Sequence, residues 1–213
     1  MAAESEASFA KDYRGARRAF IEACGRAHAD SIARVHPKAL APDGKPLFID
    51  SAAFGSREAK KALLVITGRD GRDGPLGSRF LTRMLDAHVI PRAGGRMVLV
   101  HALNPFGFAC NRRENEDGLG LDDPAAAQSW SWEMLGAILT EDLAKCRKLR
   151  LLDVGKSRHS RVTDASDHAL ARAVAGFKPG IDLRAARLEL QPALARVAGI
   201  RVMARALATL GAS

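Results

Sequence analysis

Short continuous runs of hydrophobic residues alternate along the chain with turns that contain glycine or proline. Three of these runs, Ala62–Thr67, Met97–Leu103 and Leu149–Val154, have the length of strands, and each predicts a buried β-strand. Leu47–Ala53 predicts a further strand, because it follows a Pro-Asp-Gly turn and leads to Gly55. The pattern therefore indicates a sheet with at least one strand buried on both faces.

Between these runs, the hydrophobic positions recur at the spacing of an amphipathic helix. Residues 8–34 predict one such helix, which ends before Pro37 because a residue that precedes proline leaves the α region. Ser78–His88 and Trp132–Cys146 predict two more helices. The stretch from Thr163 to Ser213 is rich in Ala, Arg and Leu, and it too is helical in pattern.

The alternation of strands and helices predicts an α/β fold, with a mostly parallel or mixed sheet flanked by helices. A chain of 213 residues has the size of one domain, so residues 1–213 are expected to form a single α/β domain. Within it, we expect an N-terminal helical segment over residues 1–36 and a helical C-terminal segment over residues 163–213.

Composition narrows the compartment that we expect for the protein. No hydrophobic run approaches the roughly 18 residues that span a bilayer, and the N-terminus lacks the pattern of a secretory signal. The three cysteines are odd in number and lie in hydrophobic or helical surroundings, which favours buried free thiols in a reducing compartment. These features predict a cytoplasmic protein that does not act on a membrane.

Lys and Arg exceed Asp and Glu, and the formal net charge is +9. The basic residues form only short clusters at Arg14–Arg18, Arg112–Arg113, Lys145–Arg150 and Lys156–Arg161. Aromatic residues make up 5% of the chain, too few for base-stacking platforms. The net charge alone therefore does not favour nucleic acid or another polyanion as a partner.

The glycine-rich loop that follows the Ala62–Thr67 strand, GRDGRDGPLG, is the strongest candidate for chemistry. It lacks the Lys-Ser/Thr of a P-loop and the glycine spacing of a dinucleotide fold. Its two carboxylates, Asp70 and Asp73, would suit a hard cation such as Mg²⁺. They would equally suit a tight turn in which each carboxylate accepts local hydrogen bonds.

Other candidates are weaker. Arg112 and Arg113 precede three carboxylates in a charged loop, which faces a substrate or forms salt bridges at the surface. No CxxC or HExxH motif and no Ser/His/Asp arrangement is visible in the sequence. His101, inside a strand, is expected to be a core histidine, and His159 and His168 lack a ligand partner nearby.

Three segments together carry a resemblance: HPKALAPDGKPLFID, LLVITGRDGRDGPLGS and MVLVHALNPFGFACNRRENED. They are similar to a bacterial family of zinc-carboxypeptidase-like proteins of unassigned function. The match runs from about Tyr13 to Leu121 and resumes at Trp130–Gly155, after an apparent deletion near Pro124. The resemblance implies a carboxypeptidase A-type α/β fold in reduced form.

The same resemblance implies that the zinc ligands are lost. In the family, the glycine loop reads S-G-T-H-G-V-E-G, and its His and Glu, which bind zinc, correspond here to Asp70 and Asp73. The third ligand, a histidine at a strand end, corresponds to Gly155. An Asn-Arg pair that would hold a substrate carboxylate is replaced by Asp122 and Asp123, whose charge would repel it.

These changes point to a non-catalytic relative, a pseudoenzyme, with no catalytic residue, no zinc and no other cofactor expected. The family's catalytic glutamate lies in a part that does not align, and Glu189 is not assigned to its role. We expect such a protein to bind a partner, for example another protein, through its retained fold. One alternative is a metal-dependent amide or peptide hydrolase in which Asp70, Asp73 and Asp153 hold Mg²⁺ or Mn²⁺. A further alternative is a basic module that binds polyanions.

Overall fold

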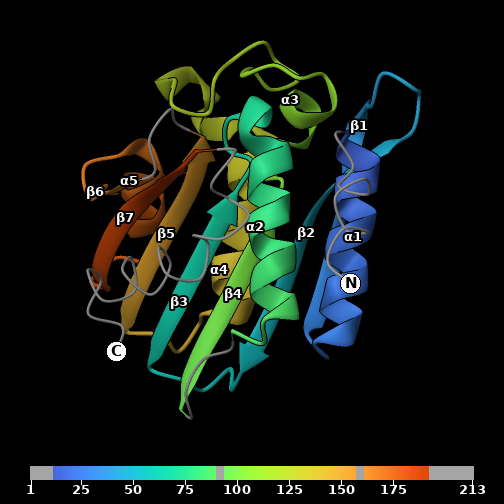
Figure 1. Ribbon diagram of the computed structural model, residues 1–213. Coiled ribbons are helices and arrows are strands. Elements are labelled where there is room, and N and C mark those ends of the chain that lie inside the picture. Colours follow the sequence, from blue (N-terminus) through green and yellow to red (C-terminus); the bar gives the residue numbers. More distant parts are fainter. Residues whose placement is uncertain (1–11, 90–93, 157–160, 192–213) are drawn as a thin grey trace.

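The computed structural model describes residues 12–89, 94–156 and 161–191, and their centre is a seven-stranded mixed sheet (Figure 1). The strands lie in the order β1-β2-β4-β3-β5-β7-β6. Their bounds are β1 Asp30–Leu40, β2 Pro46–Gly55, β3 Lys61–Thr67, β4 Gly95–His101, β5 Lys148–Lys156, β6 Arg161–Asp164 and β7 Asp182–Leu190. The four central strands, β4, β3, β5 and β7, run parallel, while β2 and β6 run antiparallel to their neighbours. The predicted α/β fold with a mixed sheet is confirmed.

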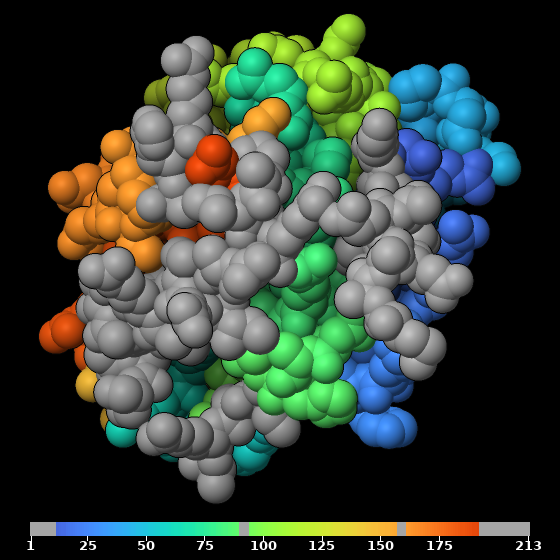
Figure 2. All heavy atoms as spheres, viewed as in Figure 1, coloured from blue at the N-terminus to red at the C-terminus, as the bar shows by residue number. Residues whose placement is uncertain are grey.

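Helices cover both faces of the sheet. On one face lie α1 (Tyr13–Arg26) and α2 (Gly74–Asp86), which contact each other; Figure 2 shows the green region of α2 near the blue region of α1. On the other face lie α4 (Trp130–Asp142) and α5 (Ala169–Phe177). Because β3 is covered on both sides, its sequence is a continuous hydrophobic run instead of an alternating one.

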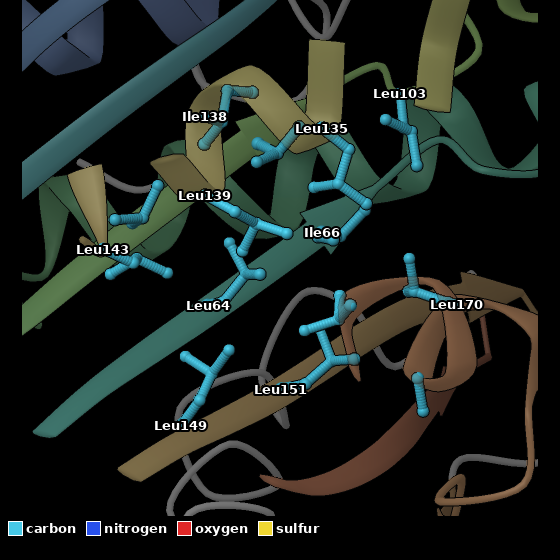
Figure 3. Close-up of a cluster of buried hydrophobic side chains, with 14 of the residues drawn as sticks. Leu64, Ile66, Leu103, Leu135, Ile138, Leu139, Leu143, Leu149, Leu151 and Leu170 are labelled. Atoms are coloured by element: carbon cyan, nitrogen blue, oxygen red, sulfur yellow. The ribbon is translucent and has the colours of Figure 1, made fainter. Parts of the chain in front are cut away.

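The larger part of the core lies between α4 and the sheet (Figure 3). Leu135 and Leu139 of α4 point toward Leu64 and Ile66 of β3, and all four side chains are fully buried. The four-residue spacing of the leucines on the helix meets the two-residue spacing on the strand, so each element presents one hydrophobic surface to the other. This packing fixes the strand ends that carry the candidate site.

The predicted strands Leu47–Ala53, Ala62–Thr67, Met97–Leu103 and Leu149–Val154 correspond to β2, β3, β4 and β5. The helices predicted at Ser78–His88 and Trp132–Cys146 are α2 and α4, and each begins earlier than predicted. The charged loop after β4 contains a short helix, α3 (Pro105–Ala109), that the sequence reading did not predict.

The N-terminal prediction is wrong beyond Arg26. Helix α1 confirms residues 13–26 of the predicted helix, but it ends there, and β1 runs straight through His36 and Pro37. The helical predictions for 8–34 and 1–36 are therefore wrong over β1, and residues 1–11 lie outside the described part. A proline is tolerated in β1 because this strand is at the edge of the sheet and needs hydrogen bonds on one side only. His36 accepts hydrogen bonds at Nδ1 from the backbone N–H groups of Lys38 and Ala39, where the register with β2 shifts.

The helical prediction for residues 163–213 is also wrong in part. Helix α5 is present, but β6 includes Thr163, and β7 is a strand inserted between β5 and β6. The sequence of β7, DLRAARLEL, has the composition of a helix, and its pairing on both sides overrides that preference. Residues 192–213 lie outside the described part of the chain.

Two further expectations can be compared with the structure. Cys24 and Cys146 are buried free thiols as predicted, whereas Cys110 is half-buried. Within the described residues, no helix combines the length and the hydrophobicity that crossing a bilayer requires. The single-domain organisation and the cytoplasmic compartment stay predictions.

Candidate functional site

The candidate site lies where the parallel strands β3, β5 and β7 reach their carboxyl ends, at the top of Figure 1. The glycine loop leaves β3 and forms a 3₁₀ turn, η1 (Gly71–Asp73), before α2 begins. Gly155 is near the end of β5, and Arg187 is on β7, directly opposite Asp153 in the strand register. Parallel α/β sheets usually place their ligands at this edge.

Asp70 precedes the 3₁₀ turn, and its carboxylate is hydrogen-bonded to Arg72. Its carboxylate accepts hydrogen bonds from the Arg72 backbone N–H at 3.1 Å and from the guanidinium at 3.2 and 2.9 Å. Partial burial acts to raise the pKa of Asp70, but these bonds outweigh it, and the pKa is lowered. Asp70 thus behaves as the capping acceptor that the turn interpretation predicted.

Asp73 lies deeper and has weaker partners. Burial is the main reason why the pKa of Asp73 is raised, and the nearby carboxylates of Asp70 and Asp153 add to the shift. The backbone N–H of Lys156 donates to it, and Arg187 Nη2 lies 3.7 Å from its Oδ2. Asp73 is therefore a carboxylate whose charge is only partly compensated.

The third predicted position, Gly155, has no side chain, and the space beside it is filled. A Cβ atom built on Gly155 would lie 2.8 Å from Cζ of Arg187 and 3.0 Å from Oδ2 of Asp73. Both distances are too short for a carbon atom with neighbours held in place. The guanidinium of Arg187 thus occupies the position where any side chain at 155 would begin.

Arg187 belongs to a chain of alternating charges that runs from β7 through β5 to the loop after β3. Its Nη1 donates to Asp153 Oδ2 at 2.5 Å, and Arg69 Nε donates to the same oxygen at 3.2 Å. Arg69 also donates through Nη1 to Asp122. Burial acts to lower the pKa of Arg69, but Asp153 and Asp122 outweigh it, and the pKa is raised. We call the set Arg69, Asp73, Asp122, Asp153 and Arg187 the arginine–carboxylate cluster.

The two predicted clamp positions have separate roles. Asp122 belongs to the arginine–carboxylate cluster and also accepts from Arg113 at 3.2 Å. Asp123 instead caps a second 3₁₀ turn, η2 (Pro124–Gln128), by accepting from the backbone N–H of Ala125 at 2.9 Å. Arg112 and Arg113 are both exposed. The structure therefore brings Asp73, Asp122 and Gly155 to one cluster and leaves Asp123 and Arg112 outside it.

The residues present do not fit zinc. A catalytic zinc site needs about three protein ligands, and within the described residues no group of three His, Cys, Asp or Glu side chains is placed to hold a metal ion. Between Asp73 and Asp153 lies a guanidinium, which repels a cation. The Mg²⁺ or Mn²⁺ alternative meets the same obstacle, because Asp70, Asp73 and Asp153 each face an arginine.

Two features were missed by the sequence reading. The first is Arg187, which lies in a segment whose composition predicts a helix and which belongs to no recognisable sequence motif. The second is a line of polar side chains beneath α1, in which Ser78 Oγ lies 2.6 Å from His101 Nε2, and His101 Nδ1 lies 3.7 Å from Asp50 Oδ2. No sequence spacing signals it, because the three residues come from α2, β4 and β2.

This Ser78–His101–Asp50 line has the order of a catalytic triad but belongs to the core. Each of the three residues is at most 3% exposed, so no substrate reaches the serine. Phe20 stacks on the imidazole with ring centroids 4.8 Å apart, and Arg17 binds the carboxylate through two hydrogen bonds of 2.8 and 2.9 Å. The line therefore anchors α1 to the sheet, and His101 is the core histidine that the sequence predicted.

A groove of about 910 Å³ lies beside α1 and the turn between β1 and β2, away from the cluster. Its lining includes Arg14 and Arg17, which pair with Asp43 and Asp50 respectively. Arg17 also lies 3.7 Å over the ring of Phe48. The lining contains charges of both signs, and its two paired arginines are already held by carboxylates.

Three solved structures show the same fold. A protein of Shewanella denitrificans described as a candidate metallopeptidase is 14% identical over 95% of this chain and 92% of that one, with a TM-score of 0.62. A metallo-carboxypeptidase from Pseudomonas aeruginosa, in complex with (2-guanidinoethylmercapto)succinic acid, is 16% identical over 92% and 68%, with a TM-score of 0.60. An aspartoacylase family protein from Mesorhizobium loti is 16% identical over 86% and 67%, with a TM-score of 0.55. The resemblance to carboxypeptidase-like proteins is thus confirmed for the fold.

The loss of zinc ligands stays a prediction at this point, since identities this low carry the fold alone. No curated protein sequence matches the chain. A family model described as "Protein of unknown function (DUF2817)" matches residues 9–122. That match covers more than half of the 213 residues, and the chain therefore belongs to the DUF2817 family.

Proposed function

We propose that this protein is a non-catalytic member of its family, which keeps a metallopeptidase-like scaffold without zinc-dependent hydrolysis. The observation that carries the proposal is the guanidinium of Arg187, which fills the space beside Gly155 and pairs with Asp153. A fixed positive charge stands at the strand edge where the related proteins named as metallopeptidases would need a cation.

Electrostatics support this reading. A metal ion at this edge would have to displace Arg187 from Asp153, a carboxylate that is only 3% exposed. Breaking a buried ion pair by removing one partner costs about 3–5 kcal/mol. The metal would then have to recover this cost with the carboxylates of Asp73 and Asp70 and no imidazole. A site built this way favours the arginine over the metal.

The scaffold would then act through binding. The arginine–carboxylate cluster joins β3, β5 and β7 with the loop that contains Asp122, so it stabilises the edge that an enzyme would leave open for substrate. A rigid edge of this kind suits a protein that presents a surface to a partner.

A hydrolase with an oxygen-ligated metal is the second candidate, and one observation favours it. Asp153 Oδ1 is buried and has no hydrogen-bond partner among the described residues. With Asp73 nearby, the two carboxylates would offer oxygen ligands to Mn²⁺ or Mg²⁺ if Arg187 moved away.

The test compares metal content and activity in the same preparation. Protein purified without chelators is submitted to elemental analysis and assayed on peptides and N-acyl amino acids, with and without added Zn²⁺, Mn²⁺ and Mg²⁺. Asp73→Ala removes a cluster carboxylate, and Asp123→Ala is the matched control outside the cluster. We expect no stoichiometric metal and no hydrolysis.

Stoichiometric zinc, together with hydrolysis that Asp73→Ala abolishes and Asp123→Ala retains, would overturn the proposal. Thermal stabilisation by Mn²⁺ or Mg²⁺ that is lost in Asp73→Ala would establish the second candidate instead.

A further inference from the structure

The opposite edge of the sheet, at the amino ends of β3 and β5, gathers basic side chains from distant parts of the sequence. The backbone N–H groups of Arg147 and Lys148 both donate to the carbonyl of Lys60, at 2.9 and 3.0 Å. Lys61 and Lys148 are register partners at the start of β3 and β5. Residues nearly 90 positions apart in the chain therefore form one cationic group.

More cations lie on the adjoining connections. Lys178 Nζ lies 3.4 Å from the carbonyl oxygen of Ala144, which places its ammonium next to Lys145. Arg57 belongs to the connection between β2 and β3 and is exposed. We call this set the basic edge: Arg57, Lys60, Lys61, Lys145, Arg147, Lys148 and Lys178. Lys148 and Lys178 are half-buried, and the other five are exposed.

The charge of the basic edge is poorly compensated. The exposed carboxylates on the same connections are Glu58 and Asp182, and Asp182 already pairs with Arg150. Asp142 is buried against Arg96, at 2.5 Å, with Arg57 farther away at 3.7 Å. Among the described residues, Lys60, Lys61, Lys145, Arg147 and Lys148 take part in no salt bridge.

We infer that the basic edge binds the phosphate backbone of a double-stranded nucleic acid. Neighbouring strands are about 4.8 Å apart. Lys61 and Lys148, which start the adjacent strands β3 and β5, therefore form a short row with Lys60 and Arg147 that can contact neighbouring phosphates. Phosphate contacts of this kind release counterions and supply affinity without reading the base sequence. The row is made by the fold, because the sequence shows only two separated clusters.

The scarcity of exposed aromatic groups favours duplex backbone over single strands and membrane surfaces. Single-strand binders stack bases on aromatic rings, and membrane-surface proteins insert hydrophobic side chains. Phe177, the exposed aromatic closest to the basic edge in sequence, packs against Gly136 in the middle of α4 instead. Within the described residues, the basic edge itself therefore consists of cations, with the partly exposed ring of Phe177 beside Lys178.

This inference does not rest on the proposed loss of catalysis. The basic edge and the arginine–carboxylate cluster lie at opposite ends of the same strands, so either conclusion can fail without the other. Hydrolase activity would leave the basic edge unchanged, and absence of nucleic-acid binding would leave the cluster unchanged.

The experiment measures anisotropy of labelled DNA and RNA duplexes of about 20 base pairs across a range of NaCl concentrations. The test variant is Lys61→Glu/Lys148→Glu, with Lys61→Gln/Lys148→Gln as a milder pair. The matched control is Arg18→Glu/Lys38→Glu, which makes the same charge change at exposed positions on α1 and β1. Circular dichroism and thermal unfolding verify that each variant folds, and vesicles of phosphatidylserine and phosphatidylcholine serve as a second polyanion.

We expect log K to fall linearly with log salt, and the Glu pair to weaken binding at least about tenfold and flatten the slope by about 2, since each neutralised phosphate contact contributes about 0.9. The Gln pair should show a smaller loss, and the control should stay within about threefold of wild type. Three results would overturn the inference: no binding to duplex at low salt, an equal loss in the control pair, or tighter binding to the vesicles than to duplex.

Discussion

Replacing Arg187 with alanine isolates the interaction on which the proposed function depends. The substitution leaves Asp153 almost fully buried, with Arg69 Nε at 3.2 Å as its remaining guanidinium partner. Breaking a buried pair costs about 3–5 kcal/mol, and the retained contact with Arg69 places the expected loss at the lower end, about 3 kcal/mol. For a chain of this length, that loss lowers Tm by about 6–12 °C.

The assay is thermal and urea unfolding of wild type and variants at pH 7. Arg184→Ala, on the same strand, is the control, because Arg184 is exposed and has no salt bridge among the described residues; it should change stability by less than about 0.5 kcal/mol. Gly155→Ala is then made in both backgrounds. Its Cβ meets both the Arg187 guanidinium and Asp73 Oδ2 in the wild type, and only Asp73 Oδ2 in Arg187→Ala, so the two effects should differ by about 1–2 kcal/mol.

Two results would refute the reasoning. If Arg187→Ala costs no more than Arg184→Ala, the guanidinium does not compensate Asp153. If Gly155→Ala is equally costly in both backgrounds, Arg187 does not occupy the space beside Gly155. The second measurement keeps the test decisive even where the first change is small.

Three other measurements follow from buried titratable groups. Burial acts to raise the pKa of Asp50, but His101 and Arg17 outweigh it and hold the pKa below 3.8. The free energy of unfolding should therefore fall as pH drops below that value, and Asp50→Asn should remove this part of the acid sensitivity. The raised pKa of Asp73 has the opposite effect: its contribution to stability is present below pH 3.8 and is lost as pH rises through the raised value. In urea unfolding at pH 7, Asp73→Asn should therefore match or exceed the stability of the wild type, and a clear loss of stability would contradict this. Burial raises the pKa of Cys24 to about 12, so a thiol reagent at pH 8 should label Cys110 well before Cys24 in the native protein.

Three of the four central strands, β3, β4 and β5, could be predicted from sequence because burial on both faces leaves a continuous hydrophobic run. The strands β1 and β7 could not, for two physical reasons. The edge strand β1 is mostly exposed, so its composition carries no burial signal. The alanines and arginines of β7 favour a helix until pairing with β5 and β6 fixes an extended conformation.

The candidate site was predictable to the same limited degree. The resemblance identified positions 70, 73 and 155, because these belong to a local motif and a strand end. Arg187 could not be found that way, since it is 32 residues from Gly155 and meets it only through the register of β5 and β7. Ion pairs between strands follow from pairing, and pairing is not visible in residue spacing.

The position of β7 between β5 and β6 has a consequence for synthesis of the protein. Because β7 spans Asp182–Leu190, a ribosome must release nearly the whole described chain before the parallel sheet can close. Until then β5 forms an unpaired edge of the sheet, and Asp153 lacks its ion pair with Arg187. A nascent chain stalled before Asp182 would carry an unpaired strand and an Asp153 that has lost one of its two arginine partners, and the open strand would make it a target for chaperones or proteases.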